Sequence, residues 1–151
     1  PSKPELAAAA LNELVTSDVV GPEARLRRGY LQLRLGHHDL ALQEFSRIDT
    51  TDRFVSYLAH LFTGWTLAQD GQVDPAIAAY RRALGVVPHA RSASTLLATF
   101  CVMSGRLADA EAVANELMQK PAAGADPWRN YLLGDFREYD ALIAAMREAV
   151  K

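Results

Sequence analysis

Histidine side chains and a cluster of carboxylates are the residues of this sequence whose types could support chemistry. His37 and His38 are adjacent in an expected turn, so they do not share the helix face that metal ligands four residues apart use. Asp135, Glu138 and Asp140 lie close together, and negative charge near a helix N-terminus explains them without catalysis. We therefore expect these side chains to have structural or solvated positions.

The remaining candidates for reactive chemistry are isolated. His60 and His89 have no cysteine or carboxylate at metal-binding spacing. Cys101, the only cysteine, cannot form an internal disulfide, and its apolar neighbours in "LLATFCVM" predict a buried, inert thiol. The sequence has no glycine-rich phosphate loop, zinc-ligand pair or nucleophile elbow. These features predict a protein that is not an enzyme and has no metal ion or cofactor.

The composition disfavours several classes of partner. The chain has 151 residues, the length of one ordinary domain, and 50% of them are apolar. Lys and Arg total 16 against 18 Asp and Glu, so bulk charge does not favour nucleic acid or an anionic membrane. No apolar stretch approaches the roughly 20 residues of a membrane span. A cytoplasmic location is favoured, with the periplasm as the alternative if a signal segment has been removed.

The elements that must position any site are expected to be helices. Apolar residues recur at helical spacing nearly everywhere, and β-branched runs typical of strands are missing. Asp74 and Asp126 stand just before prolines and are expected to cap helices. The expected helices cover residues 4–15, 22–35, 38–48, 53–69, 73–85, 89–103, 106–118, 127–133 and 137–149. The predicted fold class is all-α.

Three glycines that end expected helices reveal an internal repeat. Gly36, Gly71 and Gly105 are separated by 35 and then 34 residues, a period that indicates a solenoid. Aligning the chain on them brings small or apolar residues into register. The aligned columns are Gly29, Gly64 and Ala98; Ala41, Ala76 and Ala110; Phe45, Tyr80 and Ala114; and Ile48, Ala83 and Leu117.

This pattern resembles the tetratricopeptide repeat, a 34-residue helix-turn-helix unit, over residues 22 to about 120. The resemblance implies a right-handed α-α superhelix forming a single domain over residues 1–151. It places repeats at about 22–56, 57–90 and 91–124, an N-terminal cap helix at 4–15 and a degenerate C-terminal repeat or cap at 125–151. It also implies that Gly64 is a close packing point beside Ala76, with Tyr80 filling space between repeats.

The resemblance implies a concave groove lined by the first helix of each repeat, where partners of the family bind. In the second repeat Leu58, Leu61, Trp65 and Ala68 also form one apolar stripe by helical spacing alone. The expected lining is Leu26, Arg27, Tyr30, Leu33 and Arg34 in the first repeat, Leu58, Leu61, Phe62, Trp65, Ala68 and Gln69 in the second, and Ser92, Thr95, Leu96, Thr99, Val102 and Met103 in the third.

The groove composition disfavours one known binding mode of the family. Chaperone-binding members grip a C-terminal carboxylate with Lys, Asn and Arg, whereas the matching positions here are Leu26, Tyr30, Phe62, Ser92 and Leu96. An apolar or aromatic-bearing segment is favoured instead. The densest positive region, Arg25 to Arg28 with Arg34, is interpreted as a solvated helix face, with an acidic peptide contact as the alternative.

Two functional hypotheses follow. The first is a non-catalytic interaction module that binds a peptide or helical segment of a partner protein in the apolar groove, with Trp65 and Tyr30 as anchors. The second is a structural, regulatory or oligomerisation appendage of a larger protein, whose groove is occluded by its own chain. A homodimer through the same stripe is a third possibility. Arg outnumbers Lys 13 to 3, which fits a bacterial source with a GC-rich genome.

Overall fold

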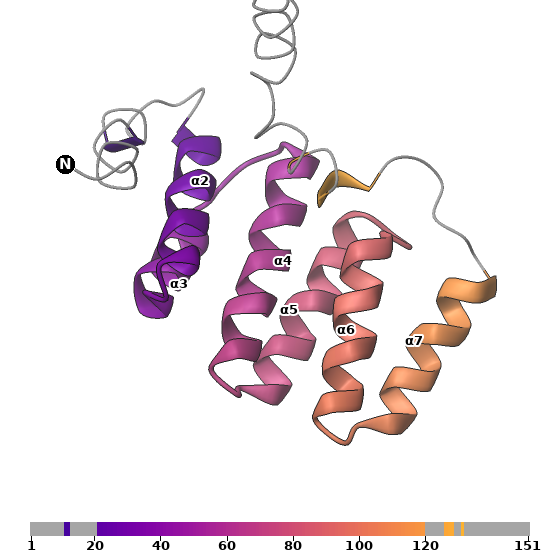
Figure 1. Cartoon of the computed structure of the whole chain (residues 1–151). Helices are drawn as coiled ribbons and strands as arrows, with labels where there is room; N and C mark the ends of the chain where they lie inside the picture. The colour runs from indigo at the N-terminus through magenta and orange to yellow at the C-terminus, as the bar shows by residue number, and fades with distance from the viewer. Residues whose placement is uncertain (1–10, 13–20, 120–125, 129–130, 132–151) are drawn as a thin grey trace, which may run out of the picture.

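A computed structural model describes residues 11–12, 21–119, 126–128 and 131 of the chain, and over these residues it contains helices and no strand. The helices are α2 (Gly21–Arg34), α3 (His38–Ser46), α4 (Arg53–Gln69), α5 (Val73–Val86), α6 (Arg91–Met103) and α7 (Leu107–Gln119). Helix α2 packs mainly on α3, α4 on α5, and α6 on α7, so three helix pairs stack in chain order (Figure 1). The all-α prediction is confirmed.

The helix boundaries agree closely with the sequence prediction. Helix α4 spans the predicted residues, and the other five helices begin and end within two residues of their predicted bounds. Gly36, Gly71 and Gly105 have φ angles of +78°, +71° and +72°, the left-handed conformation that ends a helix at little cost in glycine. The predicted helix at 137–149 and nearly all of that at 4–15 lie outside the described residues.

Side-chain caps show one correct and one wrong prediction. Asp126 Oδ1 accepts a hydrogen bond from the Trp128 amide at 2.9 Å, which confirms its predicted cap. Asp74 does not cap α5, because the helix begins earlier: the carbonyl of Gln72 already accepts from the amide of Ala76. The Asp74 carboxylate instead pairs with the guanidinium of Arg106 at 2.8 Å, which joins the second repeat to the third.

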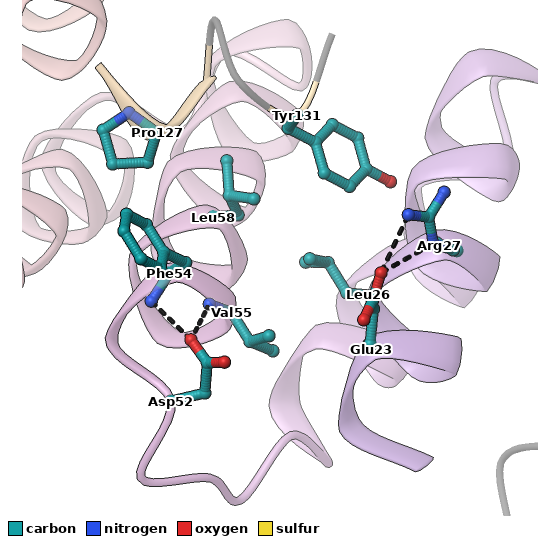
Figure 2. Close-up of a pocket in the computed structure, with 9 residues that line it drawn as sticks. All are labelled: Glu23, Leu26, Arg27, Asp52, Phe54, Val55, Leu58, Pro127 and Tyr131. Carbon is teal, nitrogen blue, oxygen red and sulfur yellow. Dashed lines mark hydrogen bonds and ion pairs between the residues drawn. The ribbon is translucent and has the colours of Figure 1, made fainter. Parts of the chain in front are cut away.

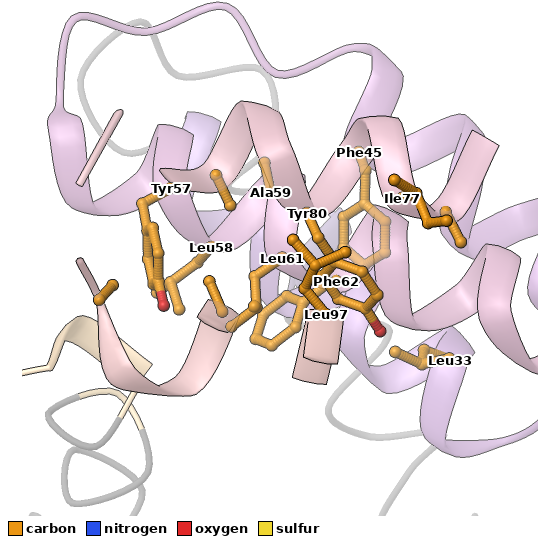
Figure 3. Packing of buried hydrophobic residues seen from close by; sticks show 14 of the residues in the cluster. Leu33, Phe45, Tyr57, Leu58, Ala59, Leu61, Phe62, Ile77, Tyr80 and Leu97 are labelled. Atoms are coloured by element: carbon orange, nitrogen blue, oxygen red, sulfur yellow. The ribbon is translucent and has the colours of Figure 1, made fainter. Parts of the chain in front are cut away.

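The core runs through all three helix pairs and is centred on α4. Tyr57, Leu61, Phe62, Tyr80 and Leu97 are among its fully buried side chains (Figure 3). Their rings and branched chains fill the space between one helix pair and the next. The predicted groove would lie along the first helices of the three pairs, α2, α4 and α6.

Two glycines permit close packing within the helix pairs. A Cβ atom added at Gly64 would lie 2.7 Å from Cδ1 of Tyr80, and one at Gly29 would lie 2.5 Å from Cε1 of Phe45. The prediction that Gly64 is a packing point is confirmed, but its nearest neighbour is the Tyr80 ring and not Ala76. The Tyr80 ring therefore packs directly against α4 at a position that has no side chain.

Candidate partner-binding groove

Aromatic rings on α2 and α4 form the floor of the groove. Tyr30 of α2 stacks on Phe62 of α4, with ring centroids 4.8 Å apart. Trp65 follows Phe62 by three residues and so lies nearly one turn further along the same face. Phe62 is buried, whereas Tyr30 and Trp65 are half-buried and keep part of their rings accessible.

Trp128, from the chain after α7, lies on this floor. Its ring meets Phe62 edge-on at a centroid distance of 5.2 Å, Tyr30 at 5.8 Å and Trp65 at 6.1 Å. These distances and edge-to-face angles are the favourable geometry for aromatic pairs. Trp128 therefore takes a place in the groove that a partner's aromatic side chain could occupy.

Tyr131 extends the same contact toward α2. Its ring stacks on Trp128 at 5.9 Å and meets Phe62 and Tyr30 edge-on at 5.6 and 5.7 Å. The guanidinium of Arg27 lies 5.4 Å from the centre of the Tyr131 ring, within the range of a cation–π interaction. Tyr131 thus lies between α2 and α4, with Arg27 beside it (Figure 2).

Asp126 fixes the other end of this segment at α6. Its Oδ2 atom accepts a hydrogen bond from the amide of Ser92 at 2.6 Å, in the first turn of α6, while Oδ1 holds the Trp128 amide. A carboxylate at this place interacts favourably with the positive end of the helix dipole. Residues 126–128 accordingly lie beside the ends at which α4 and α6 begin (Figure 1).

The groove is therefore divided. We call Asp126, Pro127, Trp128 and Tyr131 the resident segment, and the residues beneath it, Leu26, Tyr30, Leu58 and Phe62, the filled half. We call the predicted lining positions that are exposed the open half: Gln69 at the end of α4 and Thr95, Thr99, Val102 and Met103 on α6. Val102 and Met103 are 55% and 79% exposed. Trp65 lies at the boundary between the halves.

Comparison with known proteins supports the repeat pattern. A family model described as Tetratricopeptide repeat matches residues 2–55 and 61–127. The chain belongs to the tetratricopeptide repeat family. The match begins at residue 2, before the region from residue 22 to about 120 that shows the resemblance in the sequence. It ends at residue 127, within the resident segment. No curated protein matches the chain at a significant level.

Tetratricopeptide repeats generally mediate protein–protein interaction and are typically scaffolds without catalytic activity. In the described part of this chain, no group of three or more His, Cys, Asp or Glu side chains could hold a metal ion. None of the helices described is both long and apolar enough to cross a membrane. Cys101 is buried, as predicted, and desolvation raises the pKa of its thiol.

The predicted lining of the tetratricopeptide groove separates into core and surface residues. Leu26, Leu33, Leu61 and Phe62 are buried, so as the structure stands they support the groove and present almost no surface to a partner. Arg27, Tyr30 and Trp65 are half-buried beside or beneath the resident segment. Arg34, Gln69, Thr95, Thr99, Val102 and Met103 are exposed. The role of these residues in partner binding stays a prediction.

The arginines near the start of α2 are largely engaged within the first repeat. Arg28 Nη2 lies 2.7 Å from Oε2 of the buried Glu44, and Arg25 Nη1 lies 4.0 Å from the same oxygen. Arg27 pairs with Glu23, four residues earlier, at 2.8 Å. The sequence did not reveal Glu44 as a buried partner, because its neighbours in α3 look like those of an ordinary exposed helix residue. Arg25, Arg27 and Arg28 are therefore half-buried and paired within the repeat, so they do not form a solvated face, whereas Arg34 is exposed. The acidic peptide contact stays a prediction.

A pocket of about 250 Å³ lies next to the resident segment, between the starts of α2 and α4 (Figure 2). Leu26, Val55 and Leu58 form its apolar lining, and Pro127 and Tyr131 close one side. Phe54 stands at its edge with 58% of its surface exposed. The resident segment therefore leaves apolar volume beside it unfilled.

Sequence reasoning left open that the chain's own terminal segment closes the groove, but it did not name Asp126, Trp128 and Tyr131 as the occupants and treated their segment as part of a degenerate terminal repeat. A signal was present, since "DPWRNY" places an acidic cap and two large aromatic residues within six positions. The separation along the chain prevented us from connecting this segment with the groove. Trp128 lies 66 residues after Phe62, and helical periodicity carries no information over that separation.

Proposed function

We propose that this tetratricopeptide repeat domain is a non-catalytic interaction module that binds a peptide or helical segment of a partner protein along its concave groove. The family's general role in protein–protein interaction supports the class of function. Within the groove, the partner binds the open half, and Trp65 at the boundary of this half is its anchor. A half-buried tryptophan beside an accessible surface is a frequent energetic centre of interfaces.

The observation that carries this proposal is the exposure of large apolar side chains on the groove positions of α6. Val102 and Met103 follow Thr95 by seven and eight residues, so the three lie on one face of the helix. Leu97 and Cys101, on the opposite face, are buried in the core. Helix α6 is thus already packed on one side and still presents apolar surface on the other, as a partner-binding surface does.

The two exposed methionines of the third repeat provide a matched test. Met103 on α6 is 79% exposed and Met118 on α7 is 81% exposed, but only Met103 belongs to the groove. A partner is first isolated by affinity capture with the wild-type domain, and its dissociation constant is then measured by calorimetry. We expect Met103→Ser combined with Val102→Ser to weaken binding at least tenfold and Met118→Ser to change it less than twofold.

Equal effects of the groove variant and the Met118→Ser control would contradict the proposal. The proposal would also be contradicted if every captured protein bound the Val102→Ser/Met103→Ser variant as tightly as it binds the wild type. Far-ultraviolet circular dichroism of each variant checks that the helices are retained. Because both methionines are exposed, their replacement should leave the fold intact.

The resident segment supports the second hypothesis, a structural or regulatory appendage whose groove is occluded by its own chain. In that case the surface that Trp65 and its neighbours present is a site of internal packing. Light scattering together with a dye for exposed apolar surface distinguishes the two functions. A monomer that binds the dye, and loses that binding in Val102→Ser/Met103→Ser, favours an open groove; a dimer or a surface that binds no dye favours occlusion.

A further inference from the structure

We infer that the resident segment is a replaceable ligand of the filled half, and that a partner enters this half by presenting the same chemical pattern. The pattern is an acidic residue, an aromatic residue two positions later and a second aromatic residue three positions after that. The inference rests on the proposed function and deepens it, because it names the chemistry of a partner segment for the same groove.

The contacts of Trp128 and Tyr131 are those of a bound peptide's anchors. Trp128 touches rings from two different helices, Tyr30 of α2 and Phe62 of α4, and Tyr131 is held between these rings and the Arg27 guanidinium. Each contact is a ring-to-ring or cation-to-ring interaction of a side chain that a partner could supply in the same way. The filled half thus recognises two aromatic side chains at fixed spacing.

The acidic residue of the pattern is bound at the start of α6. Asp126 uses one carboxylate oxygen on the Ser92 amide and the other on its own segment's Trp128 amide. Tyr57 lies close enough for the negative charge of Asp126 to raise the pKa of its phenol, together with the larger effect of burial. Its hydroxyl points toward the segment at 126–128 (Figure 3) and donates no hydrogen bond in the part of the chain described, while the nearby backbone of Ala93 acts on the phenol in the opposite sense and lowers its pKa. An incoming carboxylate would therefore find an additional donor that Asp126 leaves unused.

The fit of the resident segment is incomplete, which is what permits replacement. The pocket beside Pro127 and Tyr131 keeps about 250 Å³ of unfilled volume, and Phe54 at its edge remains largely exposed. A partner segment that adds an apolar side chain there would bury surface that the resident segment does not. The chain's own segment offsets this incomplete fit because it is part of the same molecule, so its binding is an intramolecular event with a raised effective concentration.

The test supplies the resident segment in trans. A fluorescent synthetic peptide of residues 124–133, GADPWRNYLL, is titrated with the full chain carrying Trp128→Ala and Tyr131→Ala, and anisotropy gives the dissociation constant. We expect this variant to bind the peptide at least tenfold more tightly than the wild type, whose own segment occupies the site. Met118→Ser, on the outer helix α7, is the control and should bind as the wild type does. A peptide with Asn for the aspartate and Ala for the tryptophan should not bind.

A second variant tests the acidic anchor separately. Asp126→Ala keeps both aromatic residues but removes the carboxylate at α6, so it should bind the peptide with an affinity between those of the wild type and the double variant. Equal affinity of the wild type and both variants, or no binding by a double variant that retains its helical circular dichroism, overturns the inference. Loss of helical content in the double variant overturns it as well, because the segment would then be part of the folding core.

These outcomes are independent of the test of the proposed function. A partner that depends on Val102 and Met103 while the peptide fails to bind leaves the proposed function in place and removes only the replaceable ligand. The opposite case is a peptide that binds the double variant while Val102→Ser/Met103→Ser leaves the binding of every partner unchanged. That result keeps the replaceable ligand and removes the proposed function.

Discussion

The two halves of the groove are built from equivalent helices and differ in what covers them. On α2 and α4, the rings of Tyr30 and Phe62 lie beneath Trp128 and Tyr131 of the same chain. On α6, the position equivalent to Tyr30 is the exposed Thr99 and the position equivalent to Phe62 is the half-buried Leu96, and the exposed pair Val102 and Met103 lies further along the helix. The comparison teaches that position within a repeat specifies which way a side chain points, whereas a distant segment decides whether that side chain is surface or core.

The largest expected effect lies at the floor of the filled half. Phe62 is fully buried and touches Tyr30, Phe45, Trp128 and Tyr131, so Phe62→Ala should lower the free energy of unfolding by about 3–5 kcal/mol. Val102→Ala in the open half should change it by less than about 0.5 kcal/mol. Urea denaturation of both variants measures the difference. Similar losses at the two positions would mean that the open half is also packed.

The packing beneath the groove gives the next largest effect. Gly64→Leu places a branched side chain where even a Cβ atom would lie 2.7 Å from the Tyr80 ring, and it should cost about 1–3 kcal/mol of stability. Gly85, in helix α5, has no atom within 4 Å of an added Cβ and is the matched control. Gly85→Ala should stabilise the protein by up to about 1 kcal/mol, because alanine favours the helix. Thermal melts that show both variants as equally stable would contradict the packing assignment.

Trp65, at the boundary, tests whether the division between the halves is sharp. It is half-buried and meets Trp128 edge-on, so Trp65→Ala should cost about 1–2 kcal/mol, less than Phe62→Ala, and should leave the helical content intact. If partner binding weakens while the melt changes this little, Trp65 serves the groove. A loss of stability as large as that of Phe62→Ala would place Trp65 in the core.

The smallest effect concerns the adjacent residues Cys101 and Val102 of α6, of which the first is buried and the second is exposed. Cys101 is buried and desolvation raises its thiol pKa, so less reactive thiolate is present at a given pH than for a free cysteine. We expect a thiol reagent at pH 8 to react slowly with the native chain and quickly in urea. A cysteine introduced as Val102→Cys should react at once in the native chain. Equal native rates at 101 and 102 would contradict a helix that is packed on one face only.

The sequence was enough to predict the helices and their repeat. The boundaries of α4 follow from local signals: Asp52 caps its start and Gly71, in a left-handed conformation, follows its end. The small residues Gly29 and Gly64 also indicated close packing before any contact was known. These features are local, because hydrogen bonds and caps within a helix depend on residues only three or four positions apart.

Only the tertiary structure decided which groove residues are surface. Leu26, Phe62 and Val102 are alike in sequence, as apolar residues at groove positions of a first helix, yet two are buried and one is exposed. Trp128 and Tyr131, which reach the groove from beyond α7, cover Phe62, whereas Val102 stays 55% exposed. Burial depends on every atom nearby, including those far along the chain, so the repeat pattern determined the shape of the groove and the packed structure determined how much of it is open.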